Sequence, residues 1–271
     1  MEKEGQITLE NDQILRYQVF GAGKKYVFSF HGFGQNADAF KNLPLKLKDH
    51  TIISFDLPFH GNSSFHEEKL TRQKWKEIST ILIDHFNIKQ VELIAYSIGG
   101  RFVIRFVIDH PEIVKNVTFI AADGFHYTGI YRFATSLIGK GLFRSLLKKP
   151  AKLFTLSDQL AKWGILNPSI VKFAKSQLGS KEQRIRVYNS WIYFKPLMTL
   201  QRELIASVNN HQIPVKIYAG SKDNVIKPKY FNQIDRKSNY ATVNIFPKRH
   251  HEVNEGYIKY DDERSLQKQF D

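Results

Sequence analysis

Short apolar runs alternate with helical patterns along most of this chain, and this alternation constrains its fold more than any other feature. Four runs in the first half, YVFSF, TIISFDL, VELIAYS and VTFIAAD, are rich in β-branched and aromatic residues and apolar on both faces. Strands of that kind lie inside a parallel sheet that is covered on both sides. The runs VKIYAG and ATVNIFP resume the pattern near the end. The sequence therefore predicts an α/β fold with a mostly parallel central sheet and helices on both faces.

The connections between these runs predict two helices, and the segment before them predicts a hairpin. Residues 71–86 place four large apolar side chains on one helical face, and residues 98–109 form an apolar run that stops before His110-Pro111. Residues 7–21 show two strands that turn at Asn11-Asp12.

The alternation stops between residues 125 and 205, where helix signals recur without a strand. Ser157 is predicted to cap a helix that ends at Gly164, Asn167-Pro168 to begin a helix that Gly179 ends, and Ser180 with Gln183 to form a capping box. We predict a core domain of residues 1–124 and 206–271, with a helical insertion at 125–205. A chain of 271 residues is long enough for this arrangement.

The net charge of +14 is concentrated in the same insertion, which has fourteen Lys and Arg residues against three acidic ones. Residues 137–154 alternate apolar pairs with cations, a pattern that predicts a helix with one apolar and one basic face. Three interpretations stay open: a solvated basic face, an anionic substrate attracted by the local field, or contact with a membrane surface. No nucleic-acid-binding module is recognisable, so nucleic acid is not expected as a partner.

Composition excludes several kinds of chemistry. The chain has no cysteine, which excludes disulfides, thiolate catalysis and cysteine-ligated metals. No histidine and carboxylate cluster has metal-ligand spacing, so we expect neither a metal nor a cofactor. The first ten residues, MEKEGQITLE, are charged, and no stretch approaches the roughly 18 apolar residues typical of a membrane span. We expect a cytoplasmic protein.

Ser97 is the candidate nucleophile. It lies in AYSIG, directly after the strand VELIAY and directly before a helix, which is the strand-turn-helix context of a nucleophile elbow. A serine hydroxyl needs a base to accept its proton, and that base needs an orienting acid. Asp223 follows the strand VKIYAG, and His250 and His251 follow the next strand, so the order Ser, Asp, His is present. Asp123, which also follows a strand, is the alternative acid.

Acyl transfer also needs donors for the developing oxyanion. One donor is usually the backbone N–H after the nucleophile, here that of Ile98, and the second comes from the loop after an early strand. The loop His31-Gly32-Phe33-Gly34 follows YVFSF, so Phe33 is the second predicted donor.

With these motifs the sequence resembles the α/β-hydrolase fold family, in its cap-bearing group of serine hydrolases. The segment DLPFHGNS at residues 56–63 resembles that group's D-x-P-G-H-G-x-S, with Phe59 in place of the usual glycine. The resemblance extends from residue 7 to residue 255 and implies that the helical insertion is a cap. It also implies that Asp56 and His60 hold the geometry of their loop, while His31 shapes the oxyanion loop.

The resemblance implies a role for each member of a catalytic triad. Ser97 would be the nucleophile, Asp223 the orienting acid and His250 the base, because the family's histidine often precedes a glutamate by five positions and Glu255 fits. His251 remains the alternative base. Two residues depart from the pattern, since Ala95 replaces the first glycine of the elbow and Arg249 the glycine common before the histidine.

These observations predict a metal-independent serine esterase that acts on a small acyl substrate, with anionic and lipid-like substrates both open. Relatives that use an aspartate at the elbow, such as haloalkane dehalogenases, are disfavoured by the serine. Arg101, Trp163 and Trp191 are candidate substrate-binding residues. The run YSIGGR resembles the menaquinone-pathway synthase of this fold, so elimination or carbon–carbon bond cleavage on a polyanionic substrate is the alternative chemistry. A non-catalytic binding module of the same fold is the second alternative.

Overall fold

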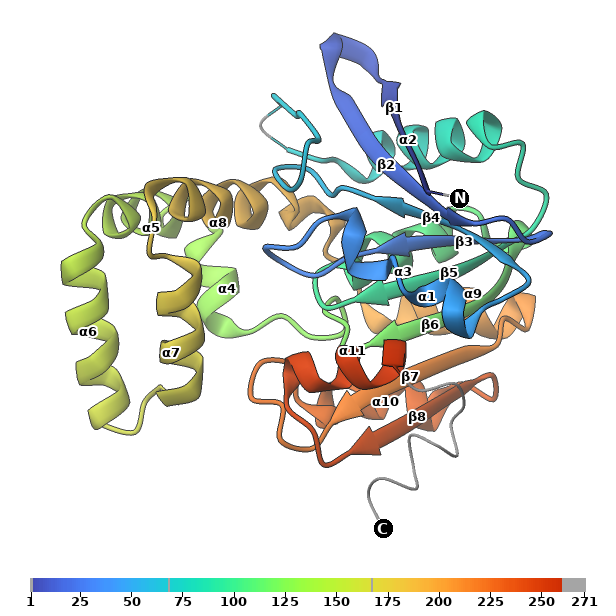
Figure 1. The fold of residues 1–271 in the computed structure, drawn as a ribbon. Coiled ribbons are helices and arrows are strands. Elements are labelled where there is room, and N and C mark those ends of the chain that lie inside the picture. Colours follow the sequence, from blue (N-terminus) through green and yellow to red (C-terminus); the bar gives the residue numbers. More distant parts are fainter. Residues whose placement is uncertain (1, 68, 167, 260–271) are drawn as a thin grey trace. The chain divides into compact units, whose positions relative to one another are not determined.

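The computed structural model describes residues 2–67, 69–166 and 168–259, which pack into two compact units (Figure 1). The α/β unit consists of the described parts of Met1–His66, Thr71–His126 and Leu197–Asp271. The helical unit consists of the described parts of Glu67–Leu70 and Tyr127–Pro196. The assignment of residues 125–205 as an inserted domain stays a prediction.

The α/β unit is built on one eight-stranded sheet with the strand order β1-β2-β4-β3-β5-β6-β7-β8. β1 and β2 are antiparallel to their neighbours, and the other strands pair in parallel. The predicted mostly parallel sheet is confirmed. The strands are β1 (Glu2–Thr8), β2 (Ile14–Gly21), β3 (Lys25–Phe30), β4 (His50–Phe55), β5 (Val91–Tyr96), β6 (Val114–Ile120), β7 (Val215–Gly220) and β8 (Ala241–Phe246).

The predicted hairpin and both predicted core helices are confirmed. Asn11 and Asp12 turn the chain between β1 and β2 with φ values of 56° and 53°, a conformation that Asn and Asp tolerate better than most residues. Thr71 caps α2 by accepting a hydrogen bond from the Lys74 N–H. The α/β unit contains α1 (Leu43–Lys46), α2 (Arg72–His85), α3 (Gly99–Asp109), α9 (Gln201–His211), α10 (Asn232–Lys237) and α11 (His250–Lys259).

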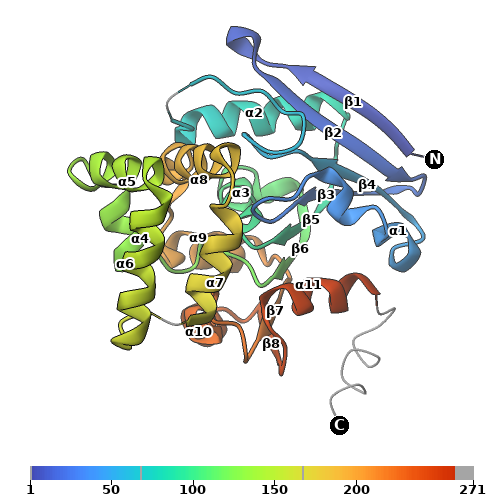
Figure 2. The ribbon, with the colours of Figure 1, turned by 60° about the vertical axis from the view of Figure 1, so that its left-hand side comes forward.

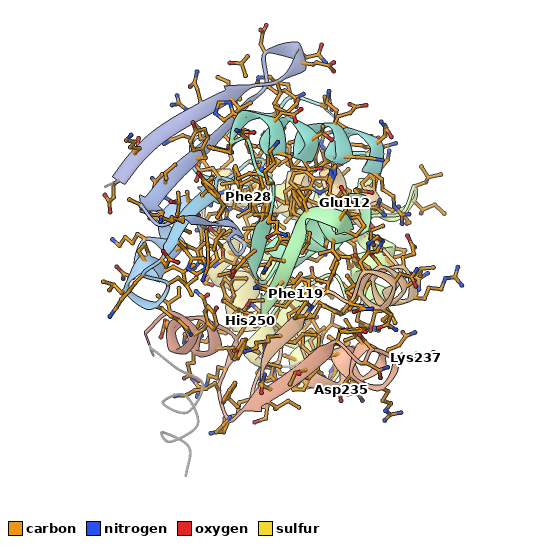
Figure 3. The ribbon with its side chains drawn as sticks, turned by 90° about the vertical axis from the view of Figure 1, so that its right-hand side faces the viewer. Phe28, Glu112, Phe119, Asp235, Lys237 and His250 are labelled. Atoms are coloured by element: carbon orange, nitrogen blue, oxygen red, sulfur yellow. The ribbon has the colours of Figure 1, made fainter. Side chains whose placement is uncertain are left out.

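Helices cover both faces of the sheet (Figures 1 and 2). α2, α3, α9 and α10 pack side by side on one face, and α1 and α11 on the other. On the α3 face, Phe28 and Phe30 of β3 are fully buried and contact Phe106 and Trp75 edge to face. Figure 3 shows Phe28 and Phe119 within these densely packed side chains. Short 3-10 helices connect the elements: η1 (Glu10–Asp12), η2 (Ala37–Phe40), η3 (Pro111–Ile113), η4 (Lys195–Leu197) and η5 (Pro228–Phe231).

The helical unit follows β6 in the chain and contains no strand among its described residues. Its helices are α4 (Gly129–Ala134), α5 (Gly139–Lys148), α6 (Pro150–Lys162), α7 (Pro168–Gln177) and α8 (Lys181–Tyr193). The predicted capping box of Ser180 and Gln183 begins α8 and is confirmed. α7 begins at the predicted Pro168, whereas Asn167 lies outside the described residues.

Two predictions for the helical unit are wrong. Residues 137–154 do not form one amphipathic helix, because Pro150 ends α5 at Lys148 and begins α6. Ser157 caps no helix: it lies inside α6, where its hydroxyl donates to the Phe154 carbonyl. The start signal of α6 is Pro150, seven residues before the predicted cap. Gly164 does follow the end of α6, with φ at 72°.

Candidate active site

Ser97 sits on a sharp turn between β5 and α3. Its φ is 50°, in the left-handed region that non-glycine residues rarely adopt. The turn is held on both sides, because the Ser97 N–H donates to the Ile120 carbonyl at 3.1 Å and the Ser97 carbonyl accepts from the Asp123 N–H at 2.8 Å. The packing of β5 against β6 therefore maintains a conformation that costs on the order of 1–2 kcal/mol.

Gly99 allows α3 to start immediately after this turn. A Cβ atom at position 99 would lie 2.2 Å from the Phe30 carbonyl oxygen, which is backbone and cannot move aside. Only glycine therefore lets the first turn of α3 approach β3 this closely.

Asp223 and His250 meet Ser97 in a continuous chain of hydrogen bonds. His250 Nε2 lies 3.0 Å from Ser97 Oγ, and His250 Nδ1 lies 2.6 Å from Asp223 Oδ2. Since an ionised carboxylate only accepts, Nδ1 is the donor toward Asp223, and Nε2 is left to accept the serine proton. Ser97 and Asp223 lie in the loops after β5 and β7, and His250 begins α11 after β8, so all three are at the carboxyl edge of the sheet.

The Asp223 carboxylate is fully buried and fully hydrogen-bonded. Its Oδ1 accepts from the backbone N–H groups of Val225 and Ile226, at 2.7 and 2.9 Å. Two backbone donors and the imidazole therefore stabilise the charge that burial would otherwise disfavour. The same contacts fix which oxygen faces His250.

The structure separates the two candidate histidines. His250 is the first residue of α11, and its ring packs against Tyr96 with centroids 5.3 Å apart. His251, one position later, is exposed. Burial, together with the charges of Asp223 and Glu255, raises the pKa of Tyr96 above its usual range, so Tyr96 is a neutral phenol beside His250. No pattern in the sequence predicted the contact between Tyr96 and His250.

The alternative acid, Asp123, forms an ion pair with Arg101. Asp123 Oδ2 accepts from Arg101 Nε at 2.8 Å and from Nη2 at 2.6 Å, and both side chains are largely buried. Its other oxygen accepts from the Gly124 N–H at 2.7 Å. Arg101 therefore neutralises Asp123 beside the Ser97 turn. Its contribution to substrate binding stays a prediction.

The loop after β3 is shaped by two side chains. His31 is fully buried, with Nδ1 donating to the Gly32 carbonyl at 2.7 Å and Nε2 accepting from the Leu57 N–H at 3.0 Å. Gln35, which the sequence analysis missed, accepts from the Gly32 N–H at 2.9 Å. Within the described residues, the N–H groups of Phe33 and Ile98 have no hydrogen-bond acceptor. The predicted structural role of His31 is confirmed.

The segment after β4 is held by Asp56. Its two carboxylate oxygens accept from the N–H groups of Ala37 and Asn62, both at 2.7 Å, so they join this loop to the one after β3. His60 donates from Nδ1 to the Pro58 carbonyl at 2.9 Å. Phe59 has φ at 66°, the conformation for which glycine is the usual residue. The predicted structural roles of Asp56 and His60 are confirmed.

The two candidate tryptophans belong to the helical unit. Trp191 packs against Tyr131 and Phe143, with ring centroids 5.2 and 5.1 Å apart. Trp163 follows the last residue of α6 and is 69% exposed. Their contribution to substrate binding stays a prediction. In the part of the chain that the structure describes, no three His, Asp or Glu side chains are grouped closely enough to hold a metal ion.

The chain is similar in sequence to known hydrolases. The family model described as alpha/beta hydrolase fold matches residues 26–256. Lipase 1 of Psychrobacter immobilis is 24% identical over 239 residues, which cover 85% of this chain and 72% of the lipase. A putative esterase/lipase of Haemophilus influenzae is 31% identical over 121 residues, covering 44% of this chain and 41% of that protein.

Other relatives are matched over a smaller part of their length. The chain covers 30% of an acetyltransferase component of the acetoin cleaving system of Cupriavidus necator, at 29% identity over 41% of this chain. Thus it spans less than half of several curated relatives.

Solved structures share the fold at low identity. A thermophilic esterase from Thermogutta terrifontis, described as malate bound, has a TM-score of 0.69 at 14% identity, with 98% of this chain and 96% of that chain covered. Haloalkane dehalogenase DbeA from Bradyrhizobium elkani has a TM-score of 0.66 at 15% identity, with 99% and 96% covered.

Proposed function

Because this chain belongs to the α/β hydrolase fold family, we propose that it is a serine hydrolase of carboxylic esters that acts through Ser97, His250 and Asp223. The observation that carries the proposal is the continuous hydrogen-bond chain from Ser97 Oγ through the His250 ring to the buried Asp223 carboxylate. The esterases and lipases among its relatives support the same reaction class.

The proposed reaction begins with attack of Ser97 Oγ on the ester carbonyl carbon while His250 Nε2 accepts the hydroxyl proton. The oxyanion that forms receives hydrogen bonds from the N–H groups of Phe33 and Ile98. Collapse breaks the ester C–O bond, and His250 returns the proton to the leaving alcohol. A water molecule then attacks the acyl-enzyme by the same route, which releases the acid and restores Ser97.

Asp223 has two roles in this scheme. It keeps the imidazole proton on Nδ1, so that Nε2 can accept from Ser97, and its charge stabilises the imidazolium that forms. Its two backbone donors hold it in place, so it needs no reorganisation as the charge develops.

Labelling with a fluorophosphonate tests whether Ser97 is activated. The serine oxygen forms a bond to phosphorus, fluoride leaves, and intact mass spectrometry reads the adduct. We expect one adduct on the wild type and none on Ser97→Ala. Ser64→Ala is the matched control, because Ser64 Oγ also lies 3.2 Å from a histidine nitrogen, that of His66, and should leave labelling unchanged. A folded wild type without an adduct, or an adduct that persists in Ser97→Ala, would overturn the proposal.

Elimination on a polyanionic substrate, the alternative reaction, was suggested by the run YSIGGR. Arg101 of that run is buried and paired with Asp123, so its charge is already compensated within the protein. A non-catalytic binding module would have no need for a hydrogen-bonded Ser97, His250 and Asp223. We therefore retain acyl transfer as the proposed reaction.

We further propose that the helical unit contacts an anionic membrane surface and so gives access to a lipid-like substrate. Residues 127–196 hold thirteen Lys and Arg against two acidic residues. They also hold nine of the fourteen large apolar side chains that are exposed among the described residues, including Trp163 at 69% and Ile165 at 65%. Exposed apolar groups next to cations favour the interface of an anionic bilayer. No described helix combines the length and apolar content needed to cross a membrane.

Co-sedimentation with vesicles tests this contact. Phosphatidylcholine vesicles with about 30% phosphatidylserine should bind the protein, and pure phosphatidylcholine vesicles should bind it at least about tenfold less, with salt weakening the binding. Trp163→Ala with Ile165→Ala should weaken binding by about tenfold. The control Leu45→Ala with Ile245→Ala removes apolar side chains that are 69% and 54% exposed in the α/β unit, and should have no effect. Equal binding to both vesicle types would contradict the proposal.

A further inference from the structure

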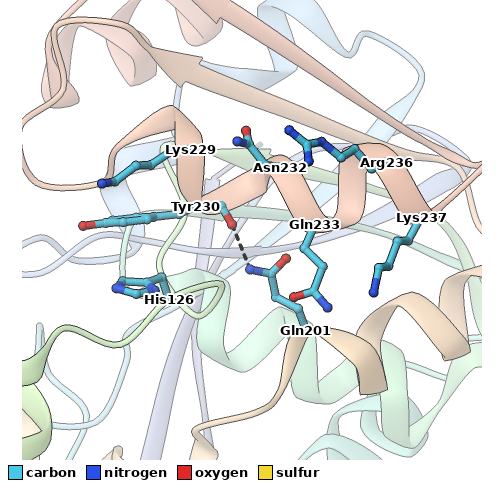
Figure 4. A pocket seen from close by; sticks show the side chains of 8 residues that line it. All are labelled: His126, Gln201, Lys229, Tyr230, Asn232, Gln233, Arg236 and Lys237. Atoms are coloured by element: carbon cyan, nitrogen blue, oxygen red, sulfur yellow. Dashed lines mark hydrogen bonds between the residues drawn. The ribbon is translucent and has the colours of Figure 1, made fainter.

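A cavity of about 520 Å³ in the α/β unit has no role in the reaction proposed above. It is bounded by η5 and α10 on one side and by His126 and the start of α9 on the other (Figure 4). None of Ser97, His250 and Asp223 lines it. The lining consists of three cations, three amide side chains and an aromatic pair.

Three cations line the cavity without a countercharge. They are Lys229, Arg236 and Lys237, and Figure 4 shows Lys229 near one end of the η5–α10 segment and Lys237 at the other. No aspartate or glutamate lines the cavity, and none of the three cations forms an ion pair among the described residues. A concave site with charge of one sign attracts an anion.

Gln201 adds an unsatisfied acceptor. Its Nε2 donates to the carbonyl oxygens of Phe125 at 2.6 Å and Tyr230 at 2.8 Å, and Figure 4 marks the second bond. Since only the NH₂ group can serve two carbonyl oxygens, the orientation of this amide is fixed. Its Oε1 is then buried without a hydrogen-bond donor in the described part of the chain. A buried acceptor in that state favours a ligand that brings an O–H or N–H group.

An aromatic pair forms the wall beside Gln201. His126 stacks on Tyr230 with ring centroids 4.3 Å apart and an interplanar angle of 18°. Burial, and after it the charges of Asp123 and Asp223, raise the pKa of Tyr230, so its phenol is a neutral hydrogen-bond donor. This wall is therefore flat and presents a neutral phenol, whereas three cations line the same cavity.

We propose that this cavity is a binding site for a small anion, a carboxylate or a phosphate monoester, that also carries a hydroxyl group. Lys229 and Lys237 attract the anionic group, and Gln201 Oε1 accepts from the hydroxyl. No residue of the proposed triad lines the site, so binding there needs no contact with Ser97.

Isothermal titration calorimetry on the full chain tests the site with three probes: glycerol 3-phosphate, glycerate and propionate. We expect saturable one-to-one binding of glycerol 3-phosphate or glycerate, which tells whether phosphate or carboxylate is preferred. Propionate has the carboxylate but no hydroxyl, and should bind at least about fivefold more weakly than glycerate because Gln201 stays unsatisfied. Ser97→Ala should bind as the wild type does, so the result stands whether or not the chain hydrolyses esters.

Paired lysine variants locate the site. Lys229→Ala with Lys237→Ala should weaken binding by about tenfold or more. The matched control is Lys89→Ala with Lys115→Ala, two exposed lysines that do not line the cavity, one before β5 and one at the start of β6, and it should leave affinity within about twofold. Lys229→Gln with Lys237→Gln repeats the test if the alanine pair lowers the melting temperature. Absence of binding by both hydroxylated probes, or equal weakening by both lysine pairs, would overturn the proposal.

Discussion

His250→Ala is expected to lower kcat/KM for ester hydrolysis by roughly 10⁴-fold or more, and His251→Ala by less than about threefold. The reason is geometric: His250 Nε2 is 3.0 Å from Ser97 Oγ, whereas the adjacent His251 side chain is exposed. Without an acceptor for its proton the serine hydroxyl is a weak nucleophile, so the acylation step fails.

Initial rates with a p-nitrophenyl ester give the comparison, since the two variants differ by one position and remove the same side chain. Far-ultraviolet circular dichroism checks that both fold. A large loss in His251→Ala with activity retained in His250→Ala would show that the proposed base is the wrong one.

Asp223→Asn is expected to lower kcat by roughly 10⁴-fold while the protein stays folded. The amide oxygen can still accept from the Val225 and Ile226 N–H groups, so the loop is preserved. The NH₂ group of the amide would donate a hydrogen bond to His250 Nδ1, so the neutral imidazole would carry its proton on Nε2. A protonated Nε2 cannot accept the proton of Ser97.

Asp123→Asn is the comparison variant that tests which aspartate acts as the acid. It removes the charge that neutralises the buried Arg101 guanidinium, so the free energy of unfolding should fall by about 3 kcal/mol. The kcat of the folded enzyme should stay within about tenfold of the wild type. Chemical denaturation and initial rates, measured on both variants, separate the two effects. A loss of kcat in Asp123→Asn that equals the loss in Asp223→Asn would contradict the assignment of the acid.

The sheet could be predicted from the sequence because its inner strands are buried on both faces. Runs such as VELIAY and VKIYAG are apolar at nearly every position, and each became a strand with boundaries close to the expected ones. The helical unit was harder to predict, since several competing start signals lie within a few residues. Pro150 decided the boundary between α5 and α6, although the apolar and basic periodicity continues across it.

The candidate site shows a second limit of sequence analysis. The order of Ser97, Asp223 and His250 could be read along the chain, but nothing in the sequence excluded Asp123 as an alternative acid. Asp123 follows a strand just as Asp223 does, and only the fold brings Arg101, from the helix after the preceding strand, to within 2.6 Å of it. The contact of Tyr96 with His250 could not be predicted either, because the two residues are distant in the chain.

The left-handed backbone at position 97 favours one residue for stability and another for the proposed activity. Glycine adopts a φ of 50° without the cost that serine incurs there, so stability alone would select glycine. A laboratory selection that rewards only survival at high temperature would therefore drift toward replacing Ser97, and would enrich well-folded chains that lack the proposed nucleophile.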